Sequence, residues 1–81
     1  MENGDEETVD EGYLDTVALE AASYLRRVGG GRLPGEVVEV LGRKGVPSQD
    51  ATDAIDHGLR TGTLVMLKTN RLDSGIVRGF L

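Results

Sequence analysis

The sequence predicts one small α+β domain: a three-helix core followed by a two-stranded antiparallel β-hairpin. Between residues 12 and 60, three runs of apolar side chains recur at intervals of three and four residues, the spacing of amphipathic helices, and glycines separate these runs. After Gly62 this spacing stops, and two short β-prone runs flank a stretch of turn residues. A chain of 81 residues has room for one such core and little else.

The first helix is expected from Gly12 to Val28. Its apolar stripe consists of Leu14, Val17, Ala18, Ala21, Leu25 and Val28. Arg26 and Arg27 suit its last turn, because cations stabilise the negative end of a helix dipole. The three glycines at residues 29–31 then end the helix.

Proline and glycine mark the two helices that follow. The second helix is expected to begin at Pro34 and to end before Gly45. The third is expected to begin at Pro47 or Ser48 and to run to about Arg60. The link between them is so short that the two helices must cross steeply. The apolar stripe of the third helix consists of Ala51, Ala54, Ile55, Gly58 and Leu59.

The hairpin is expected in residues 63–81. Its strands are predicted at Thr63–Lys68 and Ile76–Leu81, and the turn residues between them are Thr69–Gly75. The first strand has apolar residues on both faces, whereas a hairpin packed on a core needs only one apolar face. The first helix, the C-terminal residues or a second chain would cover the other face. Together with Leu19 on the polar side of the first helix, this pattern favours a homodimer or a protein partner.

Charge divides the chain into two parts. Residues 1–11 hold six acids and no base, whereas the remaining residues hold eight acids and nine bases. We therefore expect a disordered acidic tail at 1–11 and a nearly neutral domain at 12–81. The tail either keeps the protein soluble or competes for the basic side of the domain. Seven arginines against two lysines, with 14 acids, also suggest a salt-rich, halophilic cytoplasm.

Composition argues against several classes of function. Without cysteine there is no disulfide and no thiolate metal site, and the single histidine, His57, supplies at most one ligand. No run of apolar residues is long enough to span a membrane, and the acidic N-terminus is unlike a secretion signal, so a soluble cytoplasmic protein is expected. We find no catalytic residues, cofactor motif or small-molecule substrate site, and we expect no enzyme.

The segment GGRLPGEVVEVLGRKGVPSQDATDAIDHGLRTGTLVML carries a resemblance to a known family. It resembles the winged-helix variant of the helix-turn-helix, of archaeal type, over about residues 12–81. A looser likeness connects it to the C-terminal winged-helix domains of archaeal replicative helicases. In such domains a residue in the place of Leu33 often forms a short strand bridge before the second helix. A Gly-aliphatic-Pro turn (residues 45–47) opens the third helix, and Leu-x-x-Gly-x-Leu (residues 59–64) leads into the hairpin, or wing.

The resemblance implies binding to double-stranded DNA, with the third helix in the major groove and the wing on the backbone or minor groove. Gln49 would then pair with adenine, and Arg60 with guanine or a phosphate. A second basic cluster, formed by Arg32, Arg43 and Lys44, surrounds the second helix. The candidate DNA-binding residues are Ser48, Gln49, Arg60, Lys68, Arg71 and Arg78.

Three aspartates on the third helix, Asp50, Asp53 and Asp56, count against DNA binding, because each would face phosphates. The simpler interpretation is that Asp53–His57 and Asp56–Arg60 are surface pairs of the i,i+4 kind. Two functions therefore stay open. The first is a DNA-binding transcriptional regulator, and the second is a protein-interaction winged helix in a replication or transcription assembly, without direct DNA contact.

Overall fold

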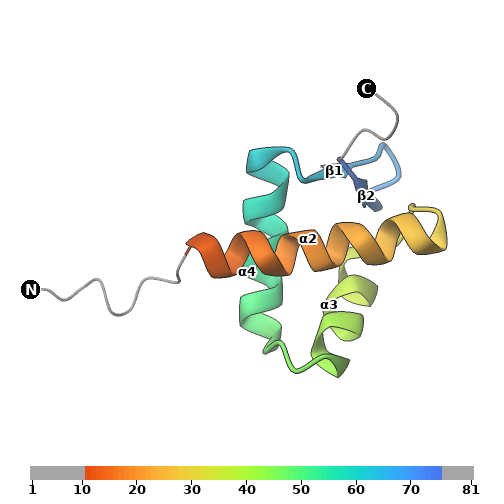
Figure 1. Cartoon of the computed structure of the whole chain (residues 1–81). Coiled ribbons are helices and arrows are strands. Elements are labelled where there is room, and N and C mark those ends of the chain that lie inside the picture. Colours follow the sequence, from red (N-terminus) through yellow and green to blue (C-terminus); the bar gives the residue numbers. More distant parts are fainter. Residues whose placement is uncertain (1–10, 76–81) are drawn as a thin grey trace, which may run out of the picture.

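The computed structural model describes residues 11–75 and folds them into three helices followed by an antiparallel hairpin (Figure 1). This arrangement confirms the predicted α+β class. Its order of elements is the layout of a winged-helix core followed by its wing. In chain order the elements are α2 (Glu11–Val28), α3 (Pro34–Arg43), α4 (Ser48–Thr61), β1 (Leu64–Met66) and β2 (Leu72–Ser74).

The helices begin and end within about one residue of the predicted positions, because glycine and proline set their ends. After α2, Gly29 has φ 90°, and the N–H of Gly30 donates to the carbonyl of Leu25 at 2.7 Å. Pro34 occupies the first turn of α3. Gly62, also at φ 90°, caps α4 by donating to Gly58 O at 2.9 Å. A left-handed residue of this kind favours glycine.

The core lies where α2 crosses α4, and it extends to α3 and the hairpin. Small residues allow the close approach: a Cβ atom added to Gly58 would lie 3.2 Å from Ala18 Cβ and 2.8 Å from Leu64 Cδ1. The buried apolar residues are Val17, Ala18, Ala21, Ala22, Leu25, Val37, Leu41, Ala51, Ala54, Ile55, Leu64 and Leu72.

The sheet has β2 at its centre. On one side β2 pairs with β1 in the register Leu64↔Ser74, Val65↔Asp73 and Met66↔Leu72. On the other side Leu72 forms an antiparallel bridge with Arg32, with N–H···O distances of 3.2 and 2.7 Å. The family resemblance led us to expect this bridge at Leu33, and it forms one residue earlier.

The predicted position of the second strand was wrong. The prediction placed it at Ile76–Leu81, with turn residues at Thr69–Gly75, whereas β2 is Leu72–Ser74. The reason is the burial of Leu72, which is the only aliphatic side chain in that stretch and is fully enclosed by the core. A short turn makes this register possible: Leu67 N–H donates to Arg71 O at 2.7 Å, and Asn70 adopts φ 62°. Residues 76–81 lie outside the described part of the chain.

Candidate nucleic-acid interface

The outer face of α4 lies opposite its buried stripe and runs the length of the helix. Ser48, Gln49, Thr52, Asp56 and Arg60 are exposed on it. The tight link after α3 turns at Gly45, which has φ 96°, and delivers the chain to Ser48. Since α2 covers the other side of α4 (Figure 1), the outer face of α4 and the outer face of α2 look in different directions.

Two of the predicted DNA-binding side chains on α4 are held by acids on the same helix. Gln49 Nε2 donates to Asp53 Oδ1 at 3.0 Å. The Arg60 guanidinium donates to Asp56, as predicted, and this hydrogen bond is the main cause that raises the pKa of Arg60. Both partners of the Arg60–Asp56 pair are largely exposed, so the pair is weak and Arg60 is able to exchange Asp56 for another anion.

The expected Asp53–His57 pair does not form. Asp53 accepts from Gln49 instead, and His57 Nε2 lies 2.7 Å from Asp15 Oδ1 on α2. The His57 side chain is only 14% exposed, because it lies beside the buried stripe and under α2. His57 therefore connects two helices and is not part of the outer face of α4.

The three aspartates of α4 differ in their surroundings. Asp50 and Asp53 are both half-buried and Asp56 is exposed, but only Asp50 accepts a hydrogen bond from α2, from the Tyr13 hydroxyl at 3.0 Å. Burial and the neighbouring Asp50 carboxylate raise the pKa of Tyr13. Asp50 thus belongs to the contact between α2 and α4, while Asp53 and Asp56 stay on the side that would face a nucleic acid.

The hairpin turn brings two predicted residues together. Lys68 and Arg71 are both exposed at the turn between β1 and β2. Arg71 Nη1 donates to Gly31 O at 3.1 Å, and Lys68 has no acidic partner within residues 11–75. Arg60 is in the last turn of α4, near the start of β1, and the length of β1, about 10 Å, separates that start from the hairpin turn. Gln49 is in the first turn of α4, about 17 Å from Arg60 along the helix axis. Arg78, the sixth candidate, lies outside the described residues.

The second basic cluster is neutralised in the structure, because an acid lies beside each of its three cations. The pairs are Arg32–Glu36 at 3.5 Å, Arg43–Glu39 at 3.4 Å and Lys44–Glu20 at 2.9 Å.

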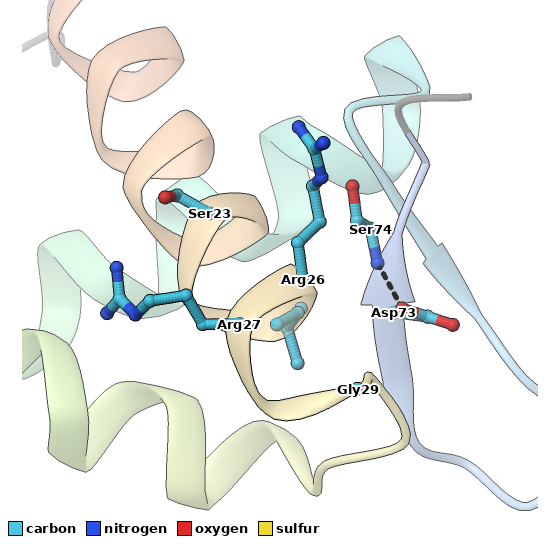
Figure 2. Close-up of a pocket in the computed structure, with 7 residues that line it drawn as sticks. Ser23, Arg26, Arg27, Gly29, Asp73 and Ser74 are labelled. Atoms are coloured by element: carbon cyan, nitrogen blue, oxygen red, sulfur yellow. Dashed lines mark hydrogen bonds between the residues drawn. The ribbon is translucent and has the colours of Figure 1, made fainter. Parts of the chain in front are cut away.

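Arg26 and Arg27 lie in the last turn of α2 and line a cavity of about 600 Å³ between α2 and β2 (Figure 2). Asp73 is on its wall, where its Oδ1 accepts from the Ser74 N–H at 2.7 Å. Figure 2 shows that Arg26 and Arg27 point in different directions, so they do not converge on one anion. No spacing in the sequence indicated this cavity, since it depends on β2 lying beside the end of α2.

Within the described residues, no group of His, Asp and Glu side chains is arranged to hold a metal ion. No helix in residues 11–75 is long and apolar enough to cross a membrane. Comparison with protein-family models, with curated proteins and with solved structures found no match for this chain.

Proposed function

We propose that this chain is a small winged-helix protein that binds double-stranded DNA and regulates transcription. The supporting observation is the outer face of α4, which no other described element covers and which leads into a hairpin turn that carries exposed Lys68 and Arg71. In this proposal α4 enters the major groove, and the hairpin lies on the adjacent backbone or minor groove.

In this proposal some side chains contact bases and others contact phosphates. Gln49 and Arg60 offer the donors that read adenine and guanine edges, once DNA replaces their partners Asp53 and Asp56. Lys68 and Arg71 neutralise phosphates, and this accounts for most of the affinity of such small modules. Asp50 keeps its charge but opposes the approach of DNA less than Asp56 does, because its carboxylate is directed toward Tyr13 on α2.

Fluorescence anisotropy with a labelled duplex at two salt concentrations tests the proposal. We expect the affinity to fall steeply with salt, and the double variant Lys68→Ala/Arg71→Ala to flatten the slope by about one unit per lost phosphate contact. The matched control is Arg26→Ala/Arg27→Ala, which also removes two exposed cations, here from the last turn of α2. An equal effect of the control would mean that only net charge matters, which contradicts the assignment of the hairpin.

The alternative is a protein-interaction winged helix in a replication or transcription assembly. The observation that favours it is the pair of carboxylates, Asp53 and Asp56, that stays on the outer face of α4. If neither the full chain nor a chain lacking residues 1–10 binds any duplex at low salt, DNA binding is excluded and this alternative takes its place.

A further inference from the structure

The outer edge of β1 has main-chain groups that point away from the sheet. Thr63 and Leu67 are hydrogen-bonded to the β2 side, through Gly75 N–H to Thr63 O at 2.8 Å and Leu67 N–H to Arg71 O at 2.7 Å. In an antiparallel pair, residues alternate between facing the partner strand and facing away from it. Val65 therefore faces β2, while the N–H and C=O groups of Leu64 and Met66 face the open edge.

This edge lacks the features that normally prevent strand addition. Residues 61–67 contain no charged residue and no proline, and β1 pairs with β2 without a bulge. Three consecutive apolar side chains are exposed along it: Val65 at 40%, Met66 at 45% and Leu67 at 37%. The opposite edge of the sheet is different, because Arg32 already bridges β2 there.

We propose that a second copy of this chain adds its β1 to this edge, antiparallel and around a two-fold axis that passes beside Val65. Leu64 and Met66 are spaced symmetrically about Val65, so Leu64 of one copy lies opposite Met66 of the other. The four N–H groups and four C=O groups of these residues then form four hydrogen bonds between the copies. The result is a continuous sheet with a closed, self-complementary interface.

The charges fit a second copy. In this register Val65 meets Val65 of the other copy and Lys68 lies opposite Gly62, so no like charges face each other. The contact is small, because a few half-exposed side chains per copy are far fewer than the roughly 20–30 residues on each side of a standard interface. The dimer is therefore a weak one, with a dissociation constant on the order of 10–100 μM.

Hydrogen exchange measured against protein concentration tests the register. We expect the amides of Leu64 and Met66 in the full chain to exchange at least about fivefold more slowly at about 1 mM than at about 5 μM, following the dimer fraction. The Val65 amide, already bonded within the hairpin, is the internal control and stays unchanged. Sedimentation equilibrium over the same range should show a monomer–dimer transition.

Charge variants at Val65 test the two-fold axis. Val65→Lys places two like charges face to face and should abolish the dimer, as should Val65→Glu, whereas an equimolar mixture of the two variants should restore it. Leu19→Lys is the matched control, because Leu19 is 50% exposed but belongs to α2 and not to β1, so this variant should leave the dimer intact. Circular dichroism checks that each variant is folded.

Three results would overturn the proposal. The first is a monomer at all concentrations with fast exchange at Leu64 and Met66, and the second is a dimer that Leu19→Lys abolishes. The third is slow exchange at both amides that does not depend on concentration, which means that another part of the same chain covers the edge. None of these measurements includes DNA, so they leave the proposed function untouched.

Discussion

At the scale of single residues, Gly58 shows how closely α2, α4 and β1 approach one another. An added methyl group would be too close to Leu64 and Ala18. We therefore expect Gly58→Ala to lower the free energy of unfolding by about 1–3 kcal/mol through overpacking, although alanine is the better helix former by about 1 kcal/mol. Denaturant unfolding followed by circular dichroism measures the difference.

Gly42 provides the matched control. It lies in α3, and a Cβ atom added there would meet nothing within 4 Å. Gly42→Ala should therefore raise the free energy of unfolding by up to about 1 kcal/mol. If the two substitutions changed stability in the same direction, close packing at Gly58 would not be the reason for its glycine.

The aspartates of α4 allow DNA binding and fold stability to be separated. Asp56→Asn removes a negative charge from the outer face and releases Arg60, so the affinity for a duplex should rise severalfold at low salt and less at high salt. Asp50→Asn removes an acid that is bonded to Tyr13 on the α2 side. It should lower the thermal midpoint slightly, because an amide oxygen is a weaker acceptor for Tyr13 and the first turn of α4 loses its acid, and it should raise the affinity less than Asp56→Asn does. Anisotropy and thermal unfolding of both variants check this contrast, and equal affinity gains would contradict it.

At the scale of elements, the helices could be predicted and the second strand could not. Helix ends are set locally, by Pro34, Gly45 and Gly62, and the apolar spacing between them is read directly from the sequence. The position of β2 depends on one leucine in a polar stretch that reaches the core. Because Asp73 and Ser74 have low β propensity, local preference favoured Ile76–Leu81, and burial of Leu72 decided otherwise.

In the candidate site, too, contacts between residues close in sequence could be predicted, and contacts that depend on how the helices pack could not. Lys68 and Arg71 are three residues apart, so their meeting at the hairpin turn follows from the chain itself. The partners of Asp50 and His57 lie on α2, 37 and 42 residues away, and depend on how the helices cross. Sequence spacing therefore predicted the Asp56–Arg60 pair and failed for His57.

The β2 assignment predicts a large effect of Leu72→Ala. Because the side chain is fully buried, its truncation should lower the free energy of unfolding by about 2–5 kcal/mol. Leu33→Ala, at a leucine that is 47% exposed beside the same sheet, should change it by less than about 0.5 kcal/mol. Urea unfolding of both variants measures the two values. Similar values would mean that Leu72 is not the residue that fixes the strand.

At the scale of the whole molecule, the composition predicts that salt stabilises the fold. With fourteen acids against nine bases, the excess negative charges repel one another in dilute buffer, and six of the acids lie within residues 1–11. We expect the thermal midpoint to rise between about 0.1 M and about 2 M KCl, as repulsion is screened and burial is strengthened. A midpoint that is indifferent to salt would count against a halophilic protein.

The acidic N-terminal segment joins the domain next to the proposed DNA-binding face. Glu11 begins α2, and its charge is among the causes that raise the pKa of Arg60 on α4. Because residues 1–10 carry five further acids, we expect them to compete with phosphates for Arg60. Deleting residues 1–10 should then tighten duplex binding at low salt, and the gain should shrink as salt screens the competition.

A chain of unchanged length, with those five acids replaced by their amides, separates charge from bulk. If the segment competes electrostatically, the amide chain and the deletion should gain affinity equally, because both remove the same five charges. If only the deletion gains, the segment blocks the face by its volume. Equal affinities of all three chains in anisotropy titrations would leave the segment no part in DNA binding.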